Sequence, residues 1–165
     1  MKSKFTLLFM LVFLQMNLYA QKIDHTAELS KLKKHIKEDK PERFRQELEN
    51  ILSVTNESNV SQILILTDHI YNIAKGGYYD ACDTLIDVLR KNHLADLLKY
   101  LSNREESEFE NAYIIFMSGK LKYSIQQNVA ISNFESNINK ILPSLSAKEK
   151  EYALNIKTVI VQKAN

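Results

Sequence analysis

The sequence predicts an all-α protein built from seven or eight short helices. Apolar residues recur at intervals of three and four along almost the whole chain, which is the spacing of one helix face. No stretch of four or more residues alternates apolar and polar side chains as a half-buried strand would. The breaks between the periodic stretches are short. We therefore expect antiparallel helix hairpins stacked side by side, either as a degenerate helical repeat or as an irregular helical bundle.

The first hairpin is expected from a helix over residues 26–38 and a second helix that begins at Pro41. Each carries its apolar side chains on one face: Leu29, Leu32 and Ile36 in the first, and Phe44, Leu48, Ile51 and Leu52 in the second. Proline suits the first turn of a helix because the N–H it lacks would have no helical partner there.

A polar gap over residues 55–59 precedes a third helix, expected over residues 60–75. Its apolar side chains occupy more than one face, which predicts a central position. Gly76 and Gly77 end it, because glycine enters the left-handed conformation of a helix terminus without strain. A fourth helix follows from Tyr78 and breaks at Asn92-His93.

The C-terminal part predicts a short fifth helix over residues 94–101 and three more helices marked by capping patterns. In such a pattern a serine at the helix start is followed three residues later by glutamate. It occurs at Ser107 and Glu110, at Ser132 and Glu135, and at Ser146 and Glu149. Pro143 is expected to stop the helix that starts at Ser132, and the last helix carries Tyr152, Ala153, Ile156, Val159 and Ile160.

Residues 1–20 have the order of a secretory signal peptide. Lys2 and Lys4 precede an apolar run from Phe5 to Leu14, and Ala20 ends a more polar segment. The ending Leu18-Tyr19-Ala20-Gln21 resembles signal peptides of Gram-negative bacteria, which implies a periplasmic or secreted product. The alternative, an uncleaved anchor, needs about 20 apolar residues, and this run has about half. We expect cleavage near Ala20, no membrane span afterwards, and a single α-helical domain over residues 21–165. A lipid-anchored protein is excluded, because it would need a cysteine at the cut site and Ala20-Gln21 offers none.

The charge of the mature chain argues against a nucleic-acid partner. The sequence has 22 basic and 20 acidic residues, and loss of Lys2 and Lys4 leaves 20 of each. Nucleic-acid binders usually carry a clear basic excess. A lysine cluster at positions 31, 33, 34 and 37 alternates with apolar residues in helical spacing. We interpret it as a solvated helix face, with a membrane or polyanion patch as the alternative.

No catalytic, cofactor or metal motif is found, so we expect no enzyme, no cofactor and no metal. Histidines 25, 35, 69 and 93 form no metal-binding pair at helical spacing. Asp80, Asp83 and Asp87 line one helix face and are interpreted as a solvated stripe rather than a cation site. Asp68 and His69 are adjacent in a helix and point about 100° apart, which excludes a catalytic pair. Glutamates 105, 106, 108 and 110 crowd a helix start, where they compensate the helix dipole. The single cysteine, Cys82, is expected to be buried rather than reactive.

One segment resembles a known repeat family. Gly76-Gly77-Tyr78-Tyr79-Asp80-Ala81 is similar to the corner between the two helices of a tetratricopeptide repeat, where an aromatic residue fills the corner and a small one allows close packing. Phe44 precedes Tyr78 by the 34 residues of that repeat, and Phe109-x-x-Ala112 echoes the aromatic-to-small spacing. Glu47, Asp68 and His69 depart from the pattern.

The resemblance implies a partner surface. In a repeat-like superhelix the polar stripe of the third helix faces the concave groove, and here that stripe is Ser61, Asp68, Asn72 and Lys75. The sequence thus favours an exported, non-catalytic helical module that binds a protein or peptide. Two alternatives remain open: a periplasmic immunity protein that neutralises a toxic enzyme, and an envelope hydrolase that uses dispersed carboxylates.

Overall fold

The computed structural model describes residues 24–165 except Lys75, Glu105 and Glu106. The described residues form eight α-helices and two 3₁₀ turns and contain no strand, which confirms the all-α fold. The helices are α2 (His25–Lys37), α3 (Pro41–Ser53), α4 (Val60–Ile73), α5 (Tyr79–Asn92), α6 (Leu94–Ser102), α7 (Glu108–Lys122), α8 (Gln127–Ile141) and α9 (Ala147–Ala164). The predicted signal peptide and its cleavage site near Ala20 lie outside the described residues. Among the described helices, none has the length and apolar character that a membrane crossing requires.

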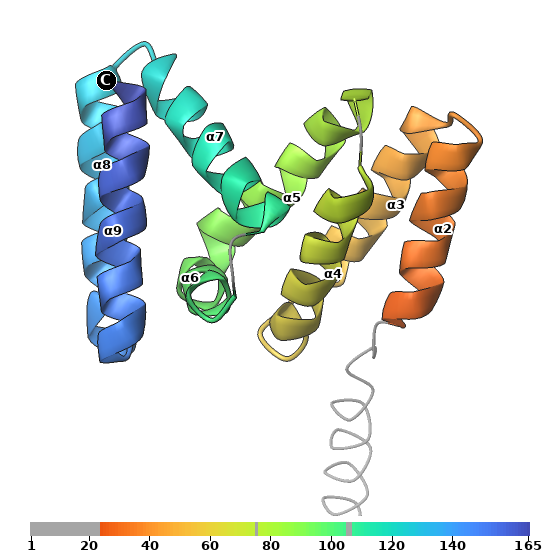
Figure 1. Ribbon diagram of the computed structural model, residues 1–165, viewed down its shortest axis with the longest axis horizontal. Coiled ribbons are helices and arrows are strands. Elements are labelled where there is room, and N and C mark those ends of the chain that lie inside the picture. The colour runs from red at the N-terminus through yellow and green to blue at the C-terminus, as the bar shows by residue number, and fades with distance from the viewer. Residues whose placement is uncertain (1–23, 75, 105–106) are drawn as a thin grey trace, which may run out of the picture.

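The first four described helices form two stacked hairpins. In Figure 1, α2 to α5 run alternately up and down, and α2 contacts α4 while α3 contacts α5. This arrangement is the stacking that the sequence predicts, and it does not continue beyond α5. Helix α6 is seen end-on in Figure 1, α7 leans away from α5, and α8 and α9 form an antiparallel pair at the opposite end of the molecule from α2.

Helix α4 is the centre of the core, as its sequence predicts. Only four of its side chains are exposed, namely Ser61, Ile65, His69 and Asn72. Helices α2, α5, α6 and α7 all pack against it. On α7, the fully buried Phe109 stacks on Tyr71 of α4, with ring centroids 5.5 Å apart and planes 11° apart. This aromatic contact joins the N-terminal hairpins to the C-terminal helices.

Two of the three predicted capping patterns begin helices. The Ser107 hydroxyl accepts from the backbone N–H of Glu110 at the start of α7. At the start of α9, Ser146 and Glu149 satisfy each other's backbone N–H groups in a complete capping box. The described part of the chain adds a cap at Asp24, whose carboxylate accepts from the first backbone N–H groups of α2.

The prediction that a helix begins at Ser132 is wrong. Helix α8 starts five residues earlier, at Gln127, and Ser132 lies within it. The Gln127 side-chain amide donates to the carbonyl oxygen of Ala164 at 2.9 Å, which ties the first turn of α8 to the end of α9. A serine followed by glutamate also fits inside a helix, so the pattern alone does not locate a start. Pro143 stands in the 3₁₀ turn just after α8, as expected of a stop.

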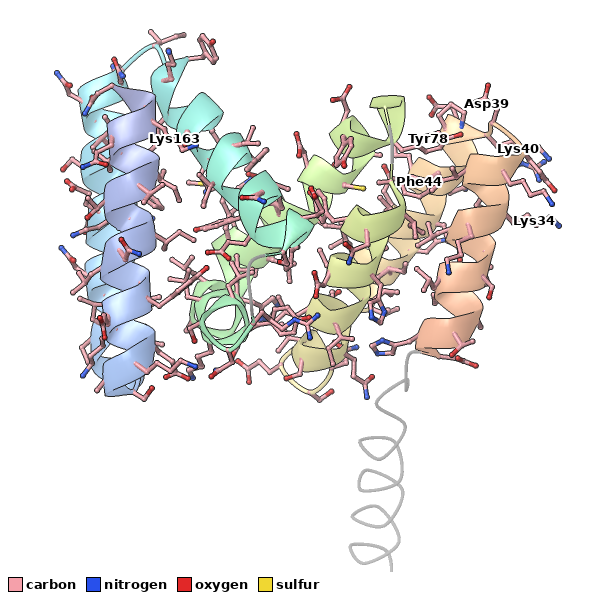
Figure 2. The ribbon with its side chains drawn as sticks, in the orientation of Figure 1. Lys34, Asp39, Lys40, Phe44, Tyr78 and Lys163 are labelled. Atoms are coloured by element: carbon pink, nitrogen blue, oxygen red, sulfur yellow. The ribbon has the colours of Figure 1, made fainter. Side chains whose placement is uncertain are left out.

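The glycine corner between α4 and α5 joins the two hairpins. Gly76 has a φ of +56°, in the left-handed region that glycine tolerates. The Tyr78 ring meets Phe44 of α3 edge-on at 5.0 Å between centroids. Its hydroxyl lies 3.3 Å from Oδ1 of Asp39 and 3.4 Å from the carbonyl oxygen of His35 (Figure 2). Tyr78 therefore fills the space at this corner.

Candidate functional site

The structure brings two of the four predicted partner-binding residues together. Asp68 and Asn72 of α4 line a polar hollow of about 640 Å³, opposite Arg104 and the first turns of α7. Ser61 is exposed near the start of α4 and is not among the residues that line this hollow. Lys75 lies outside the described residues. Of the predicted stripe, the structure therefore places Asp68 and Asn72 in one hollow.

Asp68 is not the exposed contact residue that the sequence predicts. Its side chain is 1% exposed, whereas that of its ion-pair partner Arg104 is 49% exposed. One carboxylate oxygen, Oδ2, accepts from the Tyr100 hydroxyl at 3.0 Å and from Nη2 of Arg104 at 2.5 Å. Burial, the Asp68 charge and this hydrogen bond raise the pKa of Tyr100 to about 12. Asp68 therefore fastens α4 to α6 and to the segment after it.

His69, next to Asp68 in the chain, is exposed while Asp68 is buried. The two side chains therefore lie in different environments, as adjacent helix residues should. No group of three or more histidine, cysteine or acidic side chains lies together as a metal site in the part of the chain that the structure describes. Cys82 is fully buried, and burial and the nearby Asp83 raise its pKa to about 12.

An apolar hollow adjoins the polar one. It has a volume of about 330 Å³ and lies between Tyr79 and Asp83 of α5 and the face of α7 that carries Ala112, Ile115 and Phe116. Glu108 and Asn111 line both hollows, so the two are continuous. We call this continuous depression the α5–α7 groove.

Large apolar side chains in the groove are open to solvent. Ile115 is 68% exposed and Tyr79 is 39% exposed. Scattered exposed apolar residues are common on protein surfaces, whereas here two exposed apolar side chains lie at the same hollow. The sequence gives a partial signal for these residues: both fall outside the apolar stripes of their helices. It does not show that they face each other, because α5 and α7 are separated along the chain by α6.

The groove also carries acidic groups without cationic partners. Among the described residues, neither Asp83 nor Glu108 forms an ion pair within 4.0 Å. Burial, with the nearby charge of Asp80, raises the pKa of Asp83. The interpretation of Asp80, Asp83 and Asp87 as one solvated stripe is therefore wrong. Asp80 is exposed, Asp83 is half-buried in the groove, and Asp87 is bound by three cations.

Comparisons with known protein families, with curated proteins and with solved structures find no match for this chain.

Proposed function

We propose that this protein is a non-catalytic helical module that binds a peptide segment of a partner protein in the α5–α7 groove. The observation that supports this most is the convergence of exposed Ile115 and Tyr79 on one hollow, which also contains two carboxylates that form no ion pair with any described residue. The predicted signal peptide would place the encounter in the periplasm or outside the cell.

The charge of the groove defines the occupant. Among the described residues, Asp83 and Glu108 form no ion pair within 4.0 Å, while the positive charge of Arg104 is already matched by Asp68. The groove therefore has an excess of two negative charges. Complementarity favours a segment whose apolar side chains cover Ile115 and Tyr79 and whose lysine or arginine meets Asp83 or Glu108. Aromatic and aliphatic anchors of this kind supply most of the binding energy at protein interfaces.

The polar end of the groove can hold the peptide backbone. The Asn72 side chain donates to the carbonyl oxygen of Asp68, which leaves its own carbonyl oxygen free to accept. Asn111 lines both parts of the groove and can offer an amide to either. Amide side chains pair with both the N–H and C=O groups of an extended segment. Apolar contacts would then select the sequence, while these amides fix its position.

Selection from a phage-displayed random-peptide library on the purified protein tests the proposal. The proposal expects selected peptides rich in leucine or aromatic residues together with lysine or arginine. Fluorescence polarisation should then show that Ile115→Ala and Asp83→Asn each weaken binding of a selected peptide about tenfold, which corresponds to ~1.4 kcal/mol. The matched control is Ile125→Ala, because Ile125 is fully exposed and lies outside the groove.

Two results would remove the groove as the site. One is a set of selected peptides without cationic residues. The other is a peptide whose affinity is the same for Ile115→Ala, Ile125→Ala and the unchanged protein. Because Ile115 is largely exposed, its truncation should leave the fold intact, so a loss of binding would report on the surface itself.

A further inference from the structure

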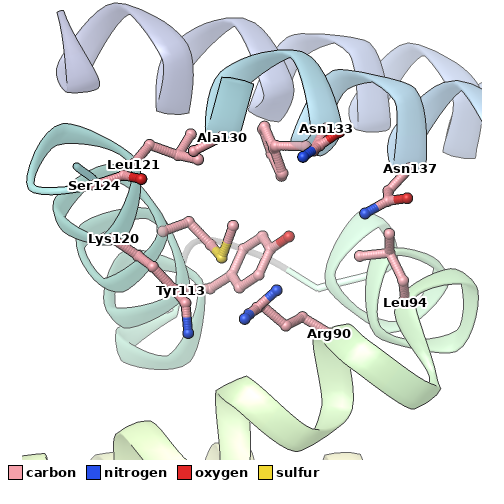
Figure 3. Close-up of a pocket in the computed structure, with 11 residues that line it drawn as sticks. Arg90, Leu94, Tyr113, Lys120, Leu121, Ser124, Ala130, Asn133 and Asn137 are labelled. Atoms are coloured by element: carbon pink, nitrogen blue, oxygen red, sulfur yellow. The ribbon is translucent and has the colours of Figure 1, made fainter. Parts of the chain in front are cut away.

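A second hollow lies on the other face of α7, and the proposed peptide site does not use it. It is a pocket of about 300 Å³ surrounded by α5, α6, α7 and α8 (Figure 3). Its apolar wall consists of Leu94, Met117, Leu121 and Phe134. We call it the four-helix pocket. It shares no lining residue with the α5–α7 groove.

The four-helix pocket contains a buried hydroxyl without a partner. The Tyr113 side chain is fully buried, and among the described residues no donor or acceptor pairs with its hydroxyl. Figure 3 shows this hydroxyl pointing into the pocket. Buried polar groups in proteins are almost always paired, so an unpaired one calls for an explanation. Burial raises the pKa of Tyr113, which keeps the phenol protonated and able to donate.

The pocket also carries two cations. Arg90 of α5 and Lys120 of α7 line the pocket and both bind Oδ1 of Asp87, at 2.5 Å from Nη2 of Arg90 and 2.6 Å from Nζ of Lys120. Lys91 binds the other carboxylate oxygen at 2.5 Å. Three cations therefore share one anion, which leaves two positive charges in excess. Burial alone would raise the pKa of Asp87, but hydrogen bonds from the three cations hold it well below its usual range.

Helix α8 adds neutral polar groups to the pocket. Asn133 and Asn137 lie one turn apart on α8, and both point toward the pocket in Figure 3. Their amides can donate to an anion or accept from a ligand hydroxyl. The pocket thus combines an apolar wall, one buried neutral donor, two cations and two amides. Small-molecule sites typically have this composition of mostly apolar lining with a few convergent polar groups.

From these groups we infer that the four-helix pocket binds a small carboxylic acid in its anionic form. The carboxylate accepts from the Tyr113 hydroxyl and pairs with Arg90 and Lys120, and the apolar body of the ligand covers Met117, Leu121 and Phe134. The pocket volume of about 300 Å³ lies at the small end of ligand sites, which favours a small ligand. The excess positive charge of Arg90, Lys91 and Lys120 over Asp87 would repel a cationic ligand. The ligand of this pocket therefore differs in charge from the peptide proposed for the groove, which carries lysine or arginine.

Isothermal titration calorimetry with three eight-carbon probes tests this inference. Octanoate is the anion, 1-octanol the neutral analogue and octylammonium the cation. The inference expects one octanoate per protein molecule, an affinity at least tenfold above that of 1-octanol, and no binding of octylammonium. Equal affinity for octanoate and 1-octanol would overturn it, because the pocket would then be merely apolar. Absence of octanoate binding would overturn it as well.

Two variants locate the site, and two more serve as controls. Tyr113→Phe removes only the hydroxyl, and Lys120→Gln removes one charge, so each should weaken octanoate binding fivefold to tenfold. Lys122→Gln is the matched control, because Lys122 is an exposed lysine of the same helix outside the pocket, and it should leave the affinity unchanged. Ile115→Ala, which alters the groove, should also leave octanoate binding unchanged. Octanoate affinity that is the same in Tyr113→Phe and in the unchanged protein would overturn the assignment.

Discussion

Helix α7 separates two hollows that have nearly the same size and opposite charge. The apolar part of the α5–α7 groove measures about 330 Å³ and the four-helix pocket about 300 Å³. Two carboxylates of the groove form no ion pair with any described residue, whereas three cations pair with one carboxylate beside the pocket. Helix α5 contributes to both: Asp83 faces the groove, and Asp87, one turn later, binds the cations at the pocket. One helical turn therefore separates two environments with different ligand preferences.

The pKa values of Asp83 and Asp87 are shifted in opposite directions, in keeping with the different surroundings of the two residues. Burial and the charge of Asp80 raise the pKa of Asp83. In the case of Asp87, the opposing effect of burial is overcome by Lys120, Lys91 and Arg90, and its pKa is lowered. Two residues of the same type, four positions apart on one helix, thus have opposite effects on stability at neutral pH.

The largest expected effect comes from the contact that supports both hollows. Phe109→Ala removes a fully buried ring stacked between α4 and α7 and should lower the free energy of unfolding by about 3–5 kcal/mol. Urea unfolding followed by far-ultraviolet circular dichroism measures it. Ile115→Ala on the same helix, at a 68% exposed position, should change stability by less than about 0.5 kcal/mol. Similar losses for the two variants would contradict this account of α7.

A smaller loss is expected from the buried carboxylate at the polar end of the groove. Asp68→Asn preserves the shape but weakens the bonds to Tyr100 and Arg104, and should cost about 1–3 kcal/mol. Arg104 is half-exposed, so its charge is not left buried, which keeps the loss below that of a fully buried ion pair. Asp80→Asn, at an exposed site, is the control: urea denaturation should give it nearly the same free energy of unfolding as the unchanged protein. Equal stability of Asp68→Asn and the unchanged protein would show that Asp68 is a free surface group.

The unpaired hydroxyl of the pocket predicts a gain instead of a loss. Tyr113→Phe removes a buried group that has no hydrogen-bond partner, so the ligand-free protein should become more stable by about 1 kcal/mol. Tyr152→Phe is the matched opposite, because the Tyr152 hydroxyl donates to Glu110 at 2.8 Å and its loss should cost about 1 kcal/mol. Thermal unfolding should give a higher midpoint for Tyr113→Phe, and a lower midpoint for Tyr152→Phe, than for the unchanged protein. A stability loss in Tyr113→Phe would indicate that its hydroxyl is already satisfied.

The smallest effects concern pH and compare the two aspartates of α5. Asp87 has a lowered pKa, so it stabilises the fold above its unfolded value of about 3.9 and this contribution disappears as pH falls through the folded value. Asp87→Asn should therefore cost up to about 1 kcal/mol at pH 7 and less below pH ~4. Asp83 has a raised pKa, so Asp83→Asn should stabilise the protein at pH 7, and the gain should vanish as pH falls through that raised pKa. Urea unfolding across this pH range measures both, and shifts of the same sign would refute the contrast.

Local signals in the sequence account for most of the fold. Pro41 begins α3, the polar segment over residues 55–59 separates α3 from α4, and Ser146 with Glu149 begins α9, each by interactions within a few residues. The start of α8 could not be predicted in this way. Its first residue, Gln127, is hydrogen-bonded to Ala164, 37 residues away, and the capping pattern at Ser132 lies within the helix.

The candidate sites depend still more on distant contacts. From the sequence, Asp68 is expected to be a polar surface residue. The partners that allow its burial, Tyr100 and Arg104, lie 32 and 36 residues away along the chain. In the sequence, Tyr113 recurs at helical spacing with Phe109, Phe116 and Met117, which predicts burial, and it is buried. The sequence does not reveal that its hydroxyl has no partner, since this follows from where α5, α6 and α8 leave a space.

The buried tyrosines have a practical consequence for spectroscopy. The chain contains no tryptophan, so tyrosine dominates its near-ultraviolet absorption. Tyr71 and Tyr113 are both held immobile in the interior, one with its ring 6.2 Å from Tyr79 in the groove and the other within the four-helix pocket. Rigid, asymmetric surroundings give a tyrosine its near-ultraviolet circular dichroism. Each hollow therefore has an intrinsic chromophore beside it, and single tyrosine-to-phenylalanine spectra would reveal which of the two a bound molecule perturbs without any added dye.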